Sequence, residues 1–79
     1  MKARIVVTLK NGVLDPQGQA IEGSLASLGF SGVAEVRQGK VFDLDLDGTD
    51  MESARSQITA MCDKLLANTV IESYRVEIA

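Results

Sequence analysis

The sequence contains no histidine and no tryptophan, and it has one cysteine and one proline in 79 residues. Histidine is the side chain most often used as an acid or base near neutral pH and the commonest nitrogen ligand for metals, so its absence weakens most hydrolase and metalloenzyme interpretations. The single Cys62 cannot form an intramolecular disulfide, and no apolar run follows the basic start. We therefore expect a cytoplasmic chain without a secretion signal or a membrane span.

Positive charge is also scarce, because 8 Lys and Arg residues face 11 Asp and Glu residues and give a net charge of −3. A surface that follows a phosphate backbone needs the opposite balance, which argues against nucleic-acid binding. The aromatic content is 4% and the hydrophobic content 46%, which predicts an aliphatic core. We expect one small domain over residues 1–79. A core of this size supplies only about 3–5 kcal/mol, so help from a partner or an oligomer is plausible.

The first strand and the first helix are the best-defined predicted elements. Ala3–Lys10 alternates between apolar and other residues, which is typical of a half-buried strand. Asp15 is a good N-cap residue, and Pro16 suits the first helical position because its missing N–H has no partner there. Apolar residues then recur at helical spacing up to Leu28, and Gly29 follows as a C-cap signal. The pattern predicts a helix from Pro16 to Leu28.

Two glycines lie inside this predicted helix. Gly18 and Gly23 each cost a helix about 1 kcal/mol relative to alanine, so they suggest a place where another backbone or a partner comes close. The alternative is that Gly18, still in the first turn, costs less and has no such role.

Two further strands and a second helix are predicted in the middle of the chain. Val33–Arg37 and Val41–Asp47 flank Gly39 and are interpreted as a hairpin that turns there. Thr49 and Glu52 form the spacing of a helix capping box. The apolar stripe of this second helix consists of Met51, Ala54, Ile58, Met61, Cys62 and Leu65.

Asn68 is the expected stop signal of the second helix, and a last strand follows over Val70–Ile78. The order strand, helix, strand, strand, helix, strand predicts an α+β, ferredoxin-like βαββαβ fold, with a four-stranded antiparallel sheet and two helices on one face. The opposite face would carry Arg4, Val6, Thr8, Val41, Asp43, Asp45, Ile71, Arg75 and Glu77. This mixture of apolar and charged residues indicates a face, or adjoining strand edges, that meets another chain.

Two groups could carry chemistry, and for each a structural role is the simpler explanation. The alternating carboxylates Asp43, Asp45 and Asp47 suit a hard metal ion, but pairing across the strands with Arg4 and Arg75 explains them equally. Cys62 lies on the apolar stripe without a histidine partner, which predicts a buried, inert thiol. We therefore predict no catalytic, metal-binding or cofactor-binding residue in this chain.

The predicted hairpin tip carries the most exposed basic group of the chain. Arg37 and Lys40 flank Gly39 there and could hold a carboxylate or a phosphate of a partner. The alternative is that they serve solubility alone, because exposed ion pairs contribute little by themselves.

Three segments together carry a family resemblance. Val7–Gly18, Val36–Lys40 and Met61–Glu72 closely resemble the small PurS subunit of phosphoribosylformylglycinamidine synthase, and the similarity spans essentially the whole chain. One departure is Thr69, which stands where that family usually has a proline before the last strand. Proline would end the second helix more sharply, so Thr69 leaves this connection less well defined.

The resemblance implies an accessory subunit of purine biosynthesis without a catalytic set of its own. In that family the complex converts formylglycinamide ribonucleotide to the amidine with ATP and with ammonia released from glutamine. A large synthetase subunit binds ATP and Mg, a glutaminase subunit releases the ammonia, and the small subunit, as a homodimer or a dimer of dimers, organises the two. The candidate subunit contacts are Val6, Val13, Leu14, Arg37, Lys40 and Ile71.

A second function class stays open at this point. A small regulatory domain could bind an amino acid or a nucleotide at the interface between paired ferredoxin-like units. Autonomous catalysis is the weakest option, because the sequence offers no set of nucleophile, base and metal ligands.

Overall fold

The computed structural model describes all residues, Met1–Ala79, and contains a three-stranded antiparallel sheet with strand order β2-β1-β3. The elements are β1 (Lys2–Leu9), α1 (Pro16–Ser27), β2 (Gly39–Asp45), α2 (Met51–Met61), the short π-helical segment η1 (Cys62–Leu66) and β3 (Glu72–Ile78). None of the helices has the length and apolar character that crossing a membrane requires.

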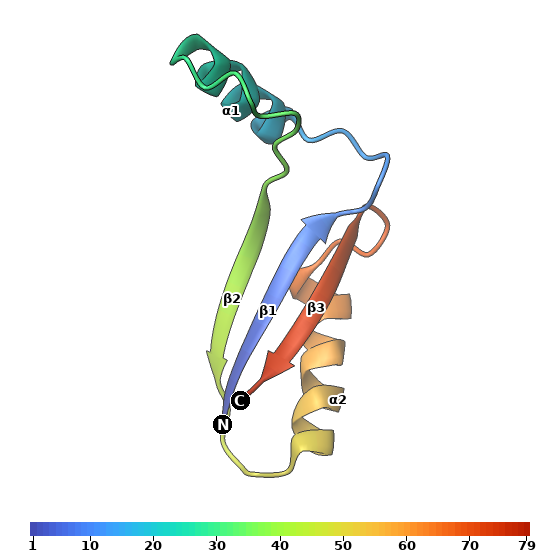
Figure 1. The fold of residues 1–79 in the computed structure, drawn as a ribbon. Helices are drawn as coiled ribbons and strands as arrows, with labels where there is room; N and C mark the ends of the chain where they lie inside the picture. Colours follow the sequence, from blue (N-terminus) through green and yellow to red (C-terminus); the bar gives the residue numbers. More distant parts are fainter.

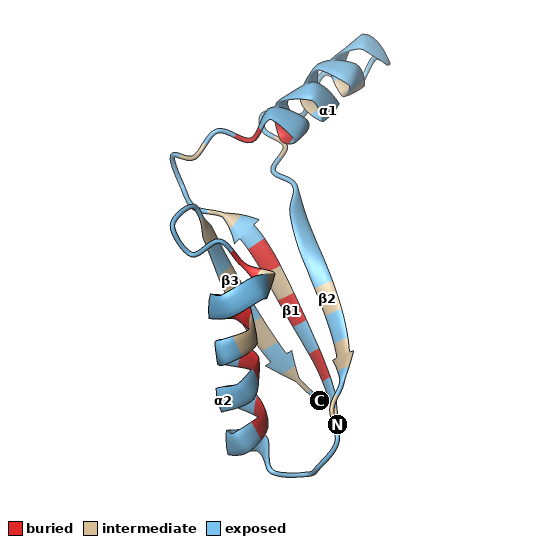
Figure 2. Ribbon diagram, turned by 180° about the vertical axis from the view of Figure 1, so that it is seen from behind, coloured by how far each residue is buried: buried red, intermediate tan, exposed pale blue.

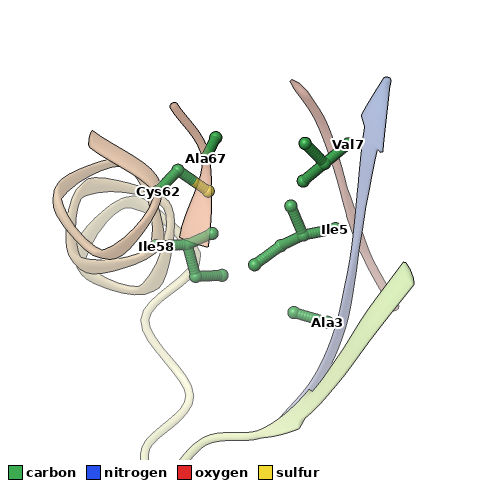
Figure 3. Close-up of a cluster of buried hydrophobic side chains, with 6 residues drawn as sticks. All are labelled: Ala3, Ile5, Val7, Ile58, Cys62 and Ala67. Carbon is green, nitrogen blue, oxygen red and sulfur yellow. The ribbon is translucent and has the colours of Figure 1, made fainter. Parts of the chain in front are cut away.

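The core lies between β1 and α2. Alternate residues of β1 point toward α2, and Ile5 and Val7 are fully buried there together with Ile58 and Cys62 (Figure 3). Partly buried side chains from β2 and the residue after it, from η1 and from β3 complete this cluster, namely Phe42, Leu44, Leu46, Leu66, Tyr74, Val76 and Ile78. The alternation predicted for the first and last strands is confirmed, because period-two patterns put one side of each strand against the helix.

The helix α1 lies beyond the end of the sheet rather than on one of its faces (Figure 1). Its predicted start is confirmed: Asp15 caps it by accepting a hydrogen bond from the Gly18 N–H, and Pro16 is its first residue. Gly29 follows with φ +98°, the left-handed conformation that favours glycine at a helix end. Gly18 is the only buried residue of the helix (Figure 2). The prediction of two helices on one face is therefore wrong, since only α2 covers the sheet.

The predicted hairpin is also wrong, and with it the fourth strand. Val33–Arg37 forms no strand, and the chain enters β2, whose first residue is Gly39, without regular secondary structure. Gly39 has no positive φ angle. It pairs with Thr8, and a Cβ atom built on it would lie 2.5 Å from the Val7 carbonyl oxygen. Close approach of two strands, rather than a turn, accounts for glycine at this position.

The helix α2 begins one residue later than the sequence indicates. Its N-cap is Asp50, whose carboxylate accepts a hydrogen bond of 3.1 Å from the Glu52 N–H, in place of the predicted Thr49. Ala54 and Ile58 are buried as predicted, whereas Leu65 is 82% exposed. The wider π-helical turn of η1 rotates the residues after Cys62 relative to an α-helix, which explains why Leu65 leaves the apolar stripe.

The turn between η1 and β3 is closed without the family's proline. The Asn68 N–H donates to the Glu72 carboxylate at 2.7 Å, and the Ile71 and Glu72 N–H groups donate to the Asn68 carbonyl. The hydrogen bond from the Asn68 N–H lowers the pKa of Glu72, since it favours the charged carboxylate, and Lys40 acts in the same direction. Side-chain and backbone hydrogen bonds therefore define the connection that Thr69 alone does not.

The molecule is long for its size. Its radius of gyration is 16.0 Å and its extents are 48 × 24 × 15 Å, whereas a compact domain of this length has a radius of about 12 Å. Only 9 of the 79 residues are buried. Both termini lie at the end of the sheet opposite α1 (Figure 1). The elongation comes from α1 and its two connections, which we call the arm (Lys10–Gln38).

Candidate functional site

The face of the sheet opposite α2, which we call the open face, has no helix over it (Figure 1). The registers of the strand pairs place on it Lys2, Arg4, Val6, Thr8, Val41, Asp43, Asp45, Ser73, Arg75 and Glu77. Its predicted composition is confirmed for these strand residues except Lys2 and Ser73, which the predicted set did not include. Ile71, the remaining member of the predicted set, lies one residue before β3 and is 39% exposed.

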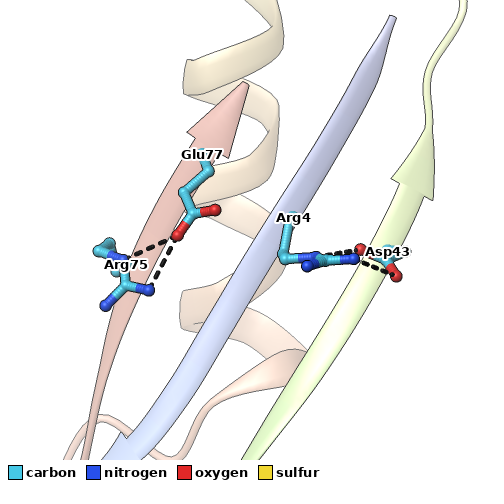
Figure 4. Close-up of polar contacts among 4 residues, drawn as sticks. All are labelled: Arg4, Asp43, Arg75 and Glu77. Carbon is cyan, nitrogen blue, oxygen red and sulfur yellow. Dashed lines mark hydrogen bonds and ion pairs between the residues drawn. The ribbon is translucent and has the colours of Figure 1, made fainter. Parts of the chain in front are cut away.

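Ion pairs neutralise most of the charge on the open face. Arg4 donates two hydrogen bonds to Asp43, of 2.8 and 3.3 Å, and Arg75 donates two to Glu77, of 3.0 and 2.8 Å (Figure 4). The hydrogen bond from Arg4 lowers the pKa of Asp43 because it favours the carboxylate. The remaining unpaired surface is partly apolar, with Val41 56% exposed. Such a face accepts a flat protein surface more readily than a small charged ligand.

The three alternating aspartates do not form a metal site. Asp43 pairs with Arg4, and Lys2 donates a 2.9 Å hydrogen bond to Asp45, which lowers the pKa of Asp45. No group of three or more acidic, histidine or cysteine side chains in the structure could hold a metal ion. Pairing across the strands, the simpler of the two explanations, therefore accounts for Asp43 and Asp45, with Lys2 in the place predicted for Arg75.

The outer edge of β2 pairs with no other strand. Met1 and Leu46 exchange hydrogen bonds of 2.9 and 2.8 Å, which makes them a directly bonded pair. In an antiparallel ladder, directly bonded pairs alternate with pairs that are not bonded to each other. The backbone N–H and C=O groups of the even-numbered β2 residues therefore bond to β1, and those of the odd-numbered residues point away from β1. Upstream of β2, the N–H groups of the even-numbered residues Val36 and Gln38 likewise bond within the chain, to side chains of the arm. Within β2, the outward backbone groups from Gly39 to Asp45 therefore have no partner strand.

The arm carries apolar side chains that the rest of the chain does not cover. Leu14 is 63% exposed, Leu28 73% and Phe30 59%. No residue of α1 belongs to the hydrophobic core between β1 and α2. Apolar side chains gathered on an uncovered element are typical of a protein contact surface.

Polar contacts, rather than a core, fix the base of the arm. Asp15 is 5% exposed and uses both carboxylate oxygens, accepting from the Gly18 N–H at 2.8 Å and from the Gln38 N–H at 2.6 Å. These two hydrogen bonds lower the pKa of Asp15 because they favour its charged form, the bond from Gln38 most strongly. Glu22 accepts a 2.9 Å hydrogen bond from the Val36 N–H. Helix and incoming strand are therefore tied by two carboxylates.

The structure brings three of the candidate contact residues together, Val13, Leu14 and Arg37, and separates the others. Arg37 donates to the carbonyls of Val13 at 2.9 Å and of Lys10 at 3.2 Å, so it belongs to the base of the arm and not to a hairpin tip. Leu14 lies in the same connection. Lys40 lies within β2 and forms a 3.4 Å ion pair with Glu72. Val6 and Ile71 lie apart from these, the first on the open face and the second before β3.

The two glycines of the first helix were predicted to mark a close approach of another backbone or a partner, and within the chain this is confirmed for Gly18 but not for Gly23. A Cβ atom on Gly18 would collide with the Val36 carbonyl oxygen, so another backbone does come close there. Gly23 has nothing within 4 Å of its Cβ position. Sequence reasoning missed Glu22 and Gln38 as partners at this site, since neither belongs to a recognisable capping pattern.

Cys62 is fully buried in the core. Burial raises the pKa of its thiol above the ordinary value, with the charge of Asp63 acting in the same direction. The predicted burial of the thiol is confirmed, and its inertness stays a prediction.

Comparison with known proteins gives one consistent result. The family model of the PurS type of phosphoribosylformylglycinamidine (FGAM) synthase matches residues 2–79. A Synechocystis protein called phosphoribosylformylglycinamidine synthase subunit PurS is 52% identical over 75 residues, which are 95% of this chain and 75% of the relative. The solved structure of Bacillus subtilis PurS has a TM-score of 0.86 at 44% identity, over 96% of this chain and 94% of that one. A chain of the PurLQS structure from Thermotoga maritima has a TM-score of 0.87 at 33% identity, over 96% and 93%.

Proposed function

Because the chain belongs to the PurS family and is a subunit of FGAM synthase in purine biosynthesis, we propose that it organises the other subunits and carries out no chemistry itself. The observation that supports this role most directly is the similarity, over nearly the whole chain, to a chain of the PurLQS structure. The sequence has no histidine, and its only thiol is buried with a raised pKa. In this proposal a large synthetase binds ATP and Mg and performs the ligase reaction, a glutaminase supplies ammonia, and all three work in the cytoplasm.

Reconstitution tests the organising role. The synthetase and glutaminase alone are expected to form the amidine from glutamine slowly, and addition of this chain is expected to restore the rate. With ammonium salt as nitrogen source, the rate should depend much less on this chain, because transfer between subunits is then bypassed. Full glutamine-dependent turnover without the chain would contradict the proposal.

The base of the arm and the start of β2 beside it are the proposed contact with these subunits. Arg37→Ala removes the hydrogen bonds to Lys10 and Val13, and Lys40→Ala removes the ion pair with Glu72. We expect the Arg37→Ala and Lys40→Ala chains to co-elute less completely with the partner subunits in gel filtration, and the control Asp43→Asn on the open face to co-elute like the wild type. If Arg37→Ala and Lys40→Ala also co-elute like the wild type, these residues are not subunit contacts.

We further propose that the chain assembles as a homodimer through the outer edge of β2. A strand edge whose unpaired groups all lie on odd-numbered residues can pair antiparallel with a second copy of itself about a twofold axis. Such pairing would set Glu35–Arg37 of one copy beside β2 of the other. The ferredoxin-like sheet of four strands, incomplete within one chain, would then be completed between two chains.

Proline at a β2 position whose backbone N–H points away from β1 tests this pairing. Val41→Pro removes an N–H that bonds to nothing within the chain, so it blocks the edge while leaving the ladder to β1 its hydrogen bonds. Analytical ultracentrifugation is expected to give a monomer for Val41→Pro and a dimer for the control Val41→Thr. A dimer of unchanged affinity with proline at this position would exclude edge pairing.

A further inference from the structure

The direction in which α1 leaves the sheet depends on very few contacts. Its residues take no part in the hydrophobic core, and Gly18 is its only buried residue. Two irregular connections join it to the sheet, one after β1 and one before β2 (Figure 1). A helix without apolar anchorage keeps a defined direction only if other contacts hold it.

Those contacts converge on Asp15. Its carboxylate joins the first turn of α1, through the Gly18 N–H, to the residue that enters β2, through the Gln38 N–H. Gly18 lies against the Val36 carbonyl, so the two segments touch backbone to backbone. A side chain at position 18 would separate them.

Two further charged side chains secure the same junction. Glu22, one turn further along α1, accepts from the Val36 N–H at 2.9 Å. Arg37 binds the carbonyls of Lys10 and Val13 and also lies 3.9 Å from the Glu35 carboxylate. The connection after β1, the helix and the connection before β2 are thereby linked to one another.

We propose that Asp15 is a positioning residue that fixes the direction of α1 relative to the sheet, by bridging the start of the helix and the entrance of β2. Capping of the helix alone does not require this bridge. An ordinary N-cap needs one acceptor oxygen, and the second oxygen of Asp15 serves Gln38 instead. The bridge is a property of the single chain and does not depend on the proposed homodimer.

Asp15→Ser separates the two roles. Serine is an equally good N-cap residue, but its side chain is shorter and has a single oxygen, so it cannot cap the helix and also accept from the Gln38 N–H. The helix is therefore expected to remain, as measured by circular dichroism, while its direction becomes variable. Asp43→Asn, which removes an exposed carboxylate of β2 that pairs with Arg4 of the sheet and touches no residue of the arm, is the matched control.

Spin-label distances test the proposal. Labels are placed through Ser24→Cys on α1 and Ser56→Cys on α2, both exposed, while Cys62 is buried and does not react. The labelled full-length chain is diluted with an excess of unlabelled chain, so that only distances within one molecule are measured. We expect a narrow distance distribution for the wild type and Asp43→Asn, and a distribution at least twice as broad for Asp15→Ser.

Acidification supplies an independent readout. The wild-type distribution is expected to broaden when Asp15 becomes protonated, and the Asp15→Ser distribution is expected not to change. The other charged groups around this junction are Glu22, Glu35, Arg37, Lys40 and Glu72. A Glu22→Gln chain that still broadens with acid assigns the transition to Asp15.

Three results would overturn the proposal: a broad wild-type distribution, an Asp15→Ser distribution as narrow as the wild type, or an acid transition that persists in Asp15→Ser. If Asp15→Ser loses the helix, Asp15→Asn decides instead. Asparagine presents one acceptor oxygen in the same shape and keeps only one of the two bonds.

Discussion

Asp15 and Ile58 stabilise different parts of the chain by different physical effects. Ile58 is fully buried against β1 and excludes water from the core. Asp15 is a buried carboxylate whose cost of burial is offset by backbone hydrogen bonds. The change in unfolding free energy caused by substitution at each site should therefore depend on different solution conditions.

Ile58→Ala is expected to destabilise the chain by about 3 kcal/mol, because it leaves a cavity in a small core. Leu65→Ala is the control, since Leu65 belongs to the same predicted stripe but is 82% exposed, and its change should stay within about 0.5 kcal/mol. Denaturant unfolding at one fixed protein concentration measures both. Equal effects would mean that η1 does not turn Leu65 out of the core.

The stability that Asp15 supplies should depend on pH. Its pKa in the folded chain is below the ordinary value of 3.8, so the carboxylate stabilises the fold fully above that value and loses the effect as the pH falls through the lower, folded pKa. The difference in unfolding free energy between wild type and Asp15→Asn is therefore expected to be largest near about pH 6 and to shrink toward about pH 3. A difference that grows on acidification would contradict the depressed pKa.

The elements differ in how completely the sequence specifies them. Both helix starts follow from short-range capping chemistry, and β1 and β3 follow from alternation, so all four could be predicted to within two residues. The π-helical turn at Cys62–Leu66 has no such local signal. Val33–Arg37 has the residues of a strand but no strand of this chain beside it, so tertiary context decided its state.

The site was predictable to a similar, limited degree. The open face follows from alternation alone, because the side-chain period of a strand fixes its two sides. The junction at Asp15 joins residues 23 positions apart through a carboxylate and a backbone N–H. Backbone partners leave no trace in residue identity, so only the Gly18 signal pointed toward it.

The helix α1 offers a matched pair of glycine substitutions. Gly23→Ala is expected to stabilise α1 by up to about 1 kcal/mol, because the position is open and alanine is the better helix former. Gly18→Ala is expected to destabilise the arm instead, since the methyl group collides with the Val36 carbonyl. Hydrogen exchange of the α1 amides, read beside global unfolding, should move in opposite directions in the two variants. Stabilisation by both would show that the close approach at Gly18 is unimportant.

For the whole molecule, the decisive quantity is how little of it is buried. With 9 buried residues and a radius of gyration of 16.0 Å, one chain gains less from burial than a compact domain of equal length. Association with a second copy would supply the missing burial, and mass action then links stability to concentration.

The unfolding temperature is therefore expected to rise with protein concentration, by several degrees over a hundredfold range. Val41→Pro should abolish this dependence while Val41→Thr keeps it. Scanning calorimetry at a series of concentrations makes the measurement. A melting temperature independent of concentration in the wild type would mean that the elongated single chain is stable alone.

The bridge at Asp15 lies at one end of α1, so a small change of angle at the bridge displaces the far end of the helix by a larger distance. A helix of 12 residues spans about 18 Å, so a swing of 10° at its base carries the far end through about 3 Å. That displacement is close to the length of a hydrogen bond. The apolar tip at Leu28 and Phe30 can thus be aimed with atomic accuracy only if the angle at the base is held to a few degrees, which one carboxylate with two backbone partners is well suited to do.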